Sequence, residues 1–253
     1  MKNNLSELLL QVKKRVNEDY LTYKDLLDEC QIAGETWQNM QFLPTLLLLP
    51  AAVWGKAGKK DVNLAAMIEM AYLAQYVHNN APQKGDGTQY RMPILIGDFL
   101  FAAAIKGLVL EKQTKWLERM GNVICRMNEG RTVRSYWQDR SYVPVDEKVE
   151  NLQKEYAELA ALSGIIGSEQ GGLDGEMSQV YTAFAYYAGV LQGIYLNGYN
   201  EEQPNVADTY LSYCRQYILS LPDALAKAAE EVLSKLTGKN ERLFSMDRLS
   251  DLA

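Results

Sequence analysis

The residues of this chain that suggest chemistry begin with His78-Asn79-Asn80, which lead into a polar loop containing Gln83 and Asp86. His78 is the only histidine of the chain, and Asp86 is the only carboxylate of the loop. Magnesium binds through charged carboxylate and phosphate oxygens, whereas the amides of asparagine and glutamine are neutral. We therefore predict no metal site here. The asparagines are equally suited to capping a helix or forming a turn, and His78 to a hydrogen bond between helices.

The elements that position these residues are predicted to be helices. Asp61–Val77 precedes the polar loop, which also contains Pro82, Gly85, Gly87 and Pro93, and Ile94–Leu108 follows it as an apolar, Ala-rich central helix. The other segments with a helical pattern are Leu5–Leu27, Leu43–Val53, Thr114–Asn128, Asp146–Ile166, Glu176–Leu196, Pro204–Ser220 and Pro222–Lys235. Pro50 is expected to kink or shorten its helix. No segment alternates as a strand would, so the sequence predicts an all-α fold.

Composition limits the classes of function. The chain has 253 residues and is predicted to form a single domain over residues 1–240, with a polar tail over residues 241–253. A net charge of −6 argues against a nucleic-acid-binding protein. Three scattered cysteines suggest neither a disulfide framework nor a zinc site and fit a cytoplasmic protein. The longest apolar run, Leu43–Trp54, is shorter than the roughly 20 residues of a membrane span, so no transmembrane segment is predicted.

Two blocks of sequence, in this order, resemble the first-motif region of the trans-polyprenyl diphosphate synthases. Val77–Asn80 stands where that family has (V/I)HDD, and Ile96–Phe101 stands where it has the GD(Y/F)LL helix. Weaker matches occur in the family's order at Leu43-Pro44, Met127–Gly130, Glu155–Leu159 and Ala188–Ile194. The resemblance spans about residues 10 to 220. It implies an all-α bundle of about ten helices around a central cavity, in a family that condenses allylic diphosphates with isopentenyl diphosphate.

The sequence departs from the family at the positions that hold metal and diphosphate. Both aspartate-rich motifs are replaced, the first by Asn79–Gln83 and the second by Leu196, Asn197 and Asn200 with the residues between them. The basic positions of the family are replaced by Met40, Gln41, Leu43 and Glu155, and by Thr88 and Gln89 near Arg91. A leaving pyrophosphate must be neutralised as its charge develops, so these joint losses are hard to reconcile with the family's reaction.

The resemblance with these departures implies a non-catalytic subunit of a heteromeric polyprenyl diphosphate synthase, of the heptaprenyl type that supplies menaquinone side chains. The implied partner is a catalytic synthase subunit, or else a second copy of the chain in a homodimer. No cofactor is expected. A prenyl diphosphate or a lipid is the ligand to consider, and nucleic acid is not.

Two alternatives stay open. An active prenyltransferase with a rebuilt magnesium site would require at least two carboxylates to converge on one pocket with perturbed pKa values, and the candidates are Glu69, Asp86, Asp98, Glu129 and Glu155. A prenyl-chain or lipid-binding protein would keep the cavity, with Ala71, Ala74, Gln75 and Asp98 as candidate lining residues and Tyr72 and Tyr76 as possible obstructions. Separately, the local basic and aromatic residues Arg131, Arg134, Tyr136, Trp137 and Arg140 are interpreted as an interface or a solvated face.

Overall fold

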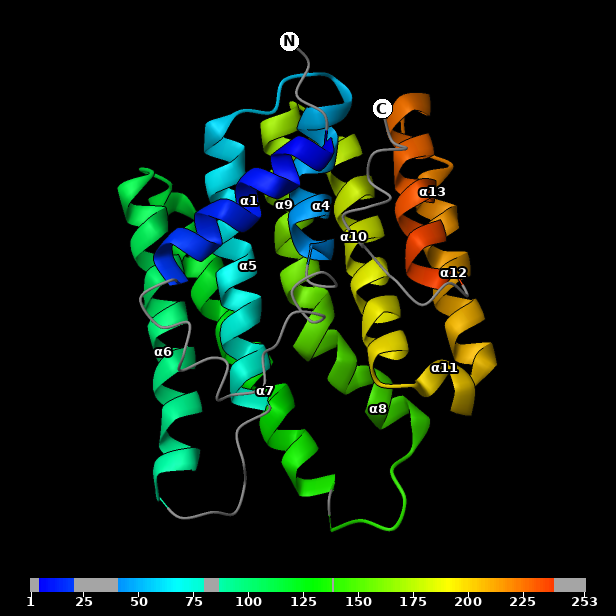
Figure 1. Cartoon of the computed structure of the whole chain (residues 1–253). Helices are drawn as coiled ribbons and strands as arrows, with labels where there is room; N and C mark the ends of the chain where they lie inside the picture. The colour runs from blue at the N-terminus through cyan, green and yellow to red at the C-terminus, as the bar shows by residue number, and fades with distance from the viewer. Residues whose placement is uncertain (1–4, 21–40, 80–86, 138, 239–253) are drawn as a thin grey trace.

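The computed structural model describes residues 5–20, 41–79, 87–137 and 139–238, and these residues form helices and the connections between them, with no strand. Figure 1 shows the helices arranged as a bundle. The α-helices are α1 (Leu5–Tyr20), α4 (Phe42–Val53), α5 (Lys59–Asn79), α6 (Gly87–Leu110), α7 (Leu117–Trp137), α8 (Val145–Leu152), α9 (Glu158–Gly171), α10 (Gly175–Leu196), α11 (Tyr199–Glu202), α12 (Pro204–Ile218) and α13 (Asp223–Thr237). A short 3₁₀ turn, Thr114–Trp116, precedes α7, and a π-helical turn, Gln153–Ala157, joins α8 to α9. The predicted all-α class is confirmed. The predicted tail lies outside the described residues.

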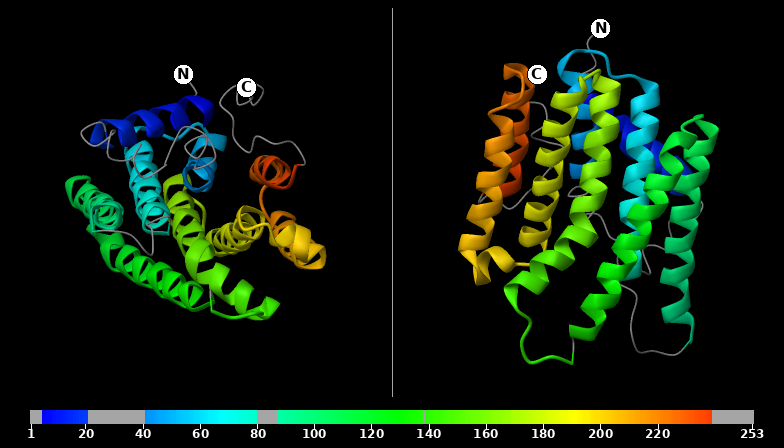
Figure 2. Two further views of the ribbon diagram at one scale, coloured as in Figure 1. Left: turned by 60° about the horizontal axis from the view of Figure 1, so that its bottom comes forward. Right: turned by 180° about the vertical axis from the view of Figure 1, so that it is seen from behind.

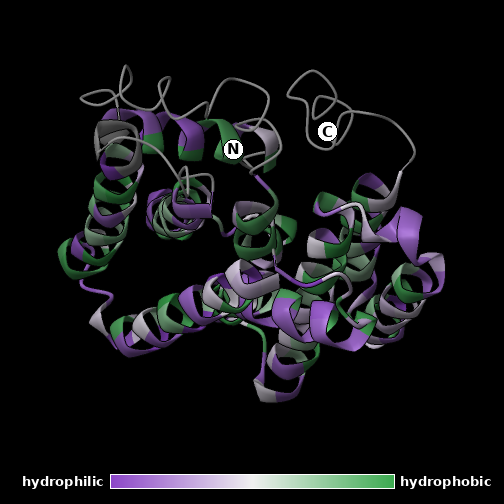
Figure 3. Cartoon of the chain, turned by 90° about the horizontal axis from the view of Figure 1, so that it is seen from below, coloured by the Kyte–Doolittle hydropathy of each residue, from purple (hydrophilic) through white to green (hydrophobic). Residues whose placement is uncertain are grey.

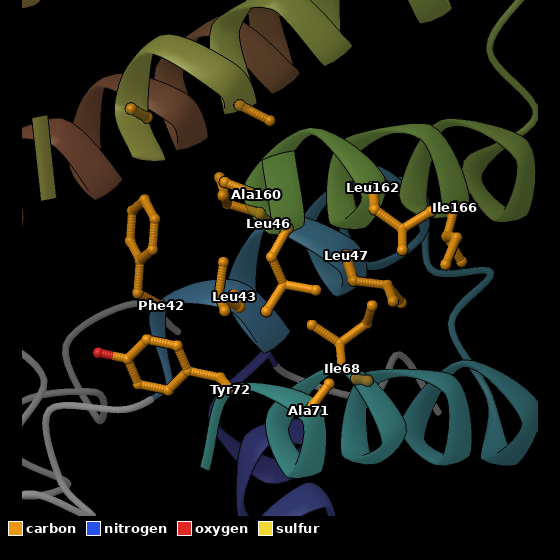
Figure 4. Packing of buried hydrophobic residues seen from close by; sticks show 14 of the residues in the cluster. Phe42, Leu43, Leu46, Leu47, Ile68, Ala71, Tyr72, Ala160, Leu162 and Ile166 are labelled. Atoms are coloured by element: carbon orange, nitrogen blue, oxygen red, sulfur yellow. The ribbon is translucent and has the colours of Figure 1, made fainter. Parts of the chain in front are cut away.

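The core of the bundle forms where α4, α5 and α9 meet. Figure 4 shows Leu43, Leu46 and Leu47 of α4 between Ile68 and Ala71 of α5 and the α9 residues Ala160, Leu162 and Ile166. Almost every residue of α5 from Asp61 to His78 is buried, as expected of a helix surrounded by other helices. A Cβ atom on Gly167 would lie 2.5 Å from the carbonyl oxygen of Leu47, so this glycine allows α9 to approach α4 closely.

Pro50 does not end α4, which continues to Val53. Proline has no N–H, so the carbonyl of Leu46, four residues earlier, loses its helical donor. The hydroxyl of Tyr181 on α10 donates a hydrogen bond to that oxygen at 2.7 Å, and Tyr181 is fully buried. The expected shortening of the helix was therefore wrong, because a side chain from a neighbouring helix supplies the missing donor.

Helix α6 is longer and more exposed than the sequence suggested. It begins at Gly87, so Pro93 lies inside the helix and not in the loop. It lies at one edge of the bundle (Figures 1 and 2), packed along α5. The expected central position was wrong, because one face of α6 packs on α5 while Leu95, Val109 and Leu110 on other faces are at least half exposed.

One described segment, Arg91–Leu110 within α6, is long and apolar enough to cross a membrane. The core helices of soluble proteins pass the same test when they are mostly buried, but only 39% of the apolar window of α6 is buried inside the bundle. The apolar run over α4, on which the sequence argument rested, is shorter and almost fully buried. The unburied apolar surface of the molecule is therefore concentrated on α6 rather than on α4.

Candidate functional site

The residues that the sequence resemblance places at the family's metal-motif positions lie at one end of the bundle, where α5, α7 and α10 end (Figure 1, lower end). Figure 3 views the molecule from this end, where hydrophilic and hydrophobic residues alternate along the surrounding helices. His78 and Asn79 close α5, Leu196 closes α10, and Asn197 caps it. Asn200 lies in the short helix α11. Asn80, Gln83 and Asp86 lie outside the described residues.

His78 joins the two blocks that carry the sequence resemblance. Its Nε2 atom lies 3.1 Å from the carbonyl oxygen of Ile94 and 3.4 Å from the Asp98 carboxylate, and its ring meets the edge of Phe101 at 5.6 Å. The ring packs directly on Gly97, where an added Cβ would lie 2.2 Å from it. The histidine and the glycine are therefore a structural contact between α5 and α6, in which the small residue makes room for the ring.

Gln75 ties the same end of α5 to α7. Its side-chain Nε2 donates to the backbone oxygen of Met127 at 3.1 Å and approaches the Asn79 side-chain oxygen at 3.4 Å. Gln75 is buried, whereas Asn79 is exposed. The side-chain amide of Gln75 therefore forms part of the contact between α5 and α7.

The strongest electrostatic feature of the site is a buried ion pair between Arg134 of α7 and Glu155 of the π-helical turn. Arg134 Nη2 lies 2.6 Å and Nε lies 3.0 Å from the two oxygens of the Glu155 carboxylate, whose side chain is 1% exposed. Asn151 also donates to this carboxylate, at 2.6 Å. Burial raises the pKa of Glu155, while Arg134 and Asn151 act in the opposite direction.

Asn197 extends this ion pair to the third helix. Its side-chain oxygen accepts a hydrogen bond from Arg134 Nη1 at 2.7 Å. Its side-chain nitrogen donates to the Gly193 carbonyl at 2.7 Å and lies 3.4 Å from the Tyr156 hydroxyl. The arginine therefore joins Asn197 and Glu155, two positions at which the sequence departs from the family that it resembles, in one network. We call Arg134, Asn151, Glu155, Tyr156 and Asn197 the Arg134 network.

The four described candidate carboxylates of a rebuilt metal site have different partners or surroundings. Glu155 pairs with Arg134, Asp98 lies beside His78, and Glu129 pairs with Arg126 at 3.1 Å on the surface. Glu69 lies deep in α5, where burial raises its pKa well above the usual value. Over the described ranges, which exclude Asp86, no group of three or more His, Cys, Asp or Glu side chains is placed to hold a metal ion.

The candidate cavity residues occupy different environments. Ala71 and Ala74 are fully buried in the hydrophobic core, and Tyr72 stands beside Phe42 there (Figure 4). Gln75 is buried as described above, and the side chain of Asp98 is 64% exposed. Gln41 and Leu43, which the resemblance places at basic positions of the family, are also buried, at the start of α4. The cavity lining stays a prediction.

Sequence reasoning missed the residues that organise this end of the bundle. Arg134 had been grouped with its basic and aromatic neighbours on a solvated face, but it turns inward because the buried Glu155 attracts its guanidinium. Asn151 and Tyr156 had received no role. No clear signal in the sequence marked Glu155, because Glu150, Lys154 and Glu158 lie close to it in the chain and nothing distinguishes the buried carboxylate from its charged neighbours.

Comparison with known proteins identifies the fold. No protein-family model matches the sequence, and no curated protein was found to be related to it. Among solved structures, decaprenyl diphosphate synthase from Rhodobacter capsulatus is similar with a TM-score of 0.76 at 15% identity, covering 92% of this chain and 96% of that one. Heptaprenyl diphosphate synthase from Staphylococcus aureus gives 0.70 at 15% identity, covering 95% and 100%. The small subunit of geranyl diphosphate synthase from Antirrhinum majus gives 0.59 at 15% identity, covering 89% and 98%. The chain therefore has the all-α fold of the prenyl diphosphate synthases.

Proposed function

We propose that this chain is a non-catalytic subunit of a heteromeric polyprenyl diphosphate synthase, in which a partner chain performs the condensation. The fold is that of prenyl diphosphate synthases, and one similar structure is by its name the small subunit of such an enzyme. The product would be a polyprenyl chain, such as the side chain of menaquinone. The chain itself would stabilise the partner and shape the tunnel that sets product length.

The Arg134 network is the observation that carries this proposal. Ionisation of an allylic diphosphate needs free positive charge, from metal or side chains, facing the leaving group. Here Arg134 is already neutralised by Glu155 and hydrogen-bonded to Asn197. Within the described part of this end, Arg134 and Glu155 neutralise each other, so this arginine is not available to bind a diphosphate.

The exposed face of α6 supports the existence of a partner chain. Leu95, Val109 and Leu110 are 59%, 50% and 66% exposed on a helix of 24 residues. Contiguous exposed apolar surface on a soluble protein commonly marks an interface. A partner subunit packed along this edge would remove these side chains from water.

The direct test is an assay for prenyl transfer with farnesyl diphosphate, isopentenyl diphosphate and magnesium. The purified chain alone is expected to give no product. Activity is expected when a synthase subunit with intact aspartate motifs, encoded beside this gene, is added. Turnover by this chain alone would overturn the proposal.

A paired substitution tests the partner face separately. Leu95→Glu with Val109→Glu places two charges on the exposed side of α6 and is expected to abolish activation of the partner and co-purification with it. Leu219→Glu is the matched control, because Leu219 is 86% exposed at the end of α12, at the opposite edge of the bundle. Equal behaviour of the control and the α6 variant would exclude α6 as the interface.

A further inference from the structure

The sequence contains a single asparagine that is followed by glycine, and this pair, Asn197-Gly198, lies at the end of α10 (Figure 1). Asparagine before glycine is the dipeptide most prone to lose its side-chain amide, because a glycine without a Cβ atom leaves its backbone nitrogen open to approach the side chain. Asn197 is also a member of the Arg134 network. The dipeptide with the greatest intrinsic lability therefore lies within the strongest electrostatic feature of the site.

The fold uses both residues of this pair. Gly198 has a φ of 70°, in the left-handed region that commonly ends a helix, and an added Cβ would meet no atom within 4 Å, so the backbone angle and not space favours glycine here. The Asn197 amide accepts from Arg134 Nη1 and donates to the Gly193 carbonyl, both at 2.7 Å. The turn and the network together place a labile pair at this position.

Deamidation of such a pair begins when the backbone nitrogen of Gly198 attacks Cγ of Asn197. A bond forms between these two atoms, and the bond from Cγ to Nδ2 breaks. The proton that the Gly198 nitrogen gives up is matched by the proton that the departing amide group takes up, so ammonia leaves. Water then opens the cyclic imide and leaves aspartate or isoaspartate at position 197. One water is consumed and one ammonia is released, and the side chain of Asn197 is only partly buried, so water can reach it.

The structure opposes the first step of this reaction. The Gly198 N–H donates to the Tyr195 carbonyl at 3.2 Å. Because ψ of Asn197 is 5°, the nitrogen of Gly198 nearly eclipses the nitrogen of Asn197 and is turned away from the side chain. Arg134, which holds the amide oxygen, is itself held by two bonds to Glu155. Ring closure must break these contacts and rotate the peptide unit.

We propose that Asn197 is a site of deamidation that the Arg134 network protects, so that the amide is lost when the network opens. The product carries a carboxylate oxygen where the amide nitrogen donates to the Gly193 carbonyl, and two acceptors then face each other at the end of α10. This inference is independent of the proposed subunit function, because it rests on the covalent chemistry of one dipeptide and on the contacts that restrain it.

The first measurement compares the folded full-length chain with the chain unfolded in concentrated urea, at one mildly alkaline pH and one temperature. Mass spectrometry of proteolytic peptides follows the gain in mass at Asn197. The folded chain is expected to react about tenfold or more slowly, because its reaction waits for local opening. Asn122, which is followed by the β-branched Val123, is the internal control and should stay unmodified in both conditions. Equal rates at Asn197 in the two conditions would overturn the proposal.

A paired substitution tests the network itself. Arg134→Met with Glu155→Met removes the guanidinium together with its counter-ion, so no uncompensated charge stays in the interior. In this variant, shown to be folded by circular dichroism, Asn197 is expected to react about tenfold faster than in the wild type, since a hydrogen bond from a charged donor is lost. Arg126→Met is the matched control, because Arg126 pairs with Glu129 on the surface, and it should leave the rate unchanged.

A milder variant serves if the double variant does not fold. Arg134→Lys keeps a positive charge beside Glu155 but lacks the planar fork that reaches the carboxylate and Asn197 together, and it is expected to raise the rate about threefold or more. A rate equal to that of the wild type in the folded variants would show that the network does not protect Asn197. A slower rate would show that the guanidinium activates the amide, and it would equally overturn the proposal.

Discussion

The two halves of the site at this end of the bundle hold their helices together in different ways. At the end of α5, His78 packs on Gly97 and Phe101 of α6, and shape complementarity holds the helices together. At the ends of α7 and α10, the Arg134 network holds three elements together through a buried ion pair. The first arrangement depends on volume and the second on charge. They should therefore respond differently to substitution and to pH.

The largest expected effect comes from breaking the ion pair. Arg134→Met leaves the buried Glu155 carboxylate without a counter-ion, and removing one partner of a buried pair costs about 3–5 kcal/mol in free energy of unfolding. Urea denaturation measures this loss. The double variant Arg134→Met with Glu155→Met is expected to recover most of it, because no uncompensated charge remains.

The matched control for this prediction is Arg126→Met. Arg126 pairs with Glu129 on the surface, where both side chains are at least half exposed, so its loss should cost about 0–1 kcal/mol. Equal costs for Arg134→Met and Arg126→Met would show that the Arg134 network does not stabilise this half.

The contact between His78 and Gly97 is tested by adding volume at Gly97. Gly97→Ala places a Cβ against the His78 ring and is expected to lower the free energy of unfolding by about 1–3 kcal/mol. In a His78→Ala background the same change should cost much less, and a double-mutant cycle measures the coupling. Gly121→Ala in α7, where no atom lies within 4 Å of the added Cβ, is the control and should stabilise by about 0.5–1 kcal/mol. Additive costs in the cycle would contradict the direct contact.

The smallest expected effect is the pH dependence of stability that Glu69 causes. Glu69 is a buried acid with no ion pair among the described residues, whereas the buried Glu155 is paired with Arg134. Glu69 is 2% exposed, and burial raises its pKa well above the usual 4.5. A raised pKa means that the folded chain holds the proton more tightly. Its contribution to stability is complete below pH 4.5 and is lost as the pH rises to the folded-state pKa, by about 1.4 kcal/mol per pH unit.

Glu69→Gln removes this titration. The free energy of unfolding of the wild type, minus that of the variant, is expected to decrease from pH 5 upward. A flat difference for Glu69→Gln would mean that Glu69 is ionised at the start of this range.

The fold was predictable from the sequence because helical patterning recurs along the chain and landmarks such as His78 and Gly97 keep their order. The helix Leu43–Val53 was predicted with Pro50 inside it, but the donor that replaces the missing N–H could not be foreseen, because the Tyr181 hydroxyl lies 135 residues further along the chain than Leu46. The edge position of α6 was missed for a related reason. An apolar composition predicts that a helix is buried, but it does not tell whether the covering surface belongs to this chain or to a partner.

The Arg134 network was not predictable residue by residue. The absence of aspartates from the segments that resemble the family's motifs was readable, but the pairing of Arg134 with Glu155 and Asn197 joins positions 21 and 63 residues away from the arginine. Only the packing of both α7 and α10 on the π-helical turn brings them together. Sequence patterns report which face of a helix is apolar, and they do not report which long side chain crosses between helices.

The π-helical turn Gln153–Ala157 lies within the continuous helical rod formed by α8 and α9. It determines how the side chains of α8 are rotated about the rod axis relative to those of α9. A π-turn holds one residue more than an α-turn, and each residue of an α-helix advances the rod by about 100°. Winding the same residues as a regular α-helix would rotate α8 by about that angle against α9, whereas deletion of one residue would keep the two helices nearly in phase. The carboxylate of Glu155 lies within this turn, where it meets Arg134. The buried charge of this end of the bundle therefore lies where the rod departs from regular winding.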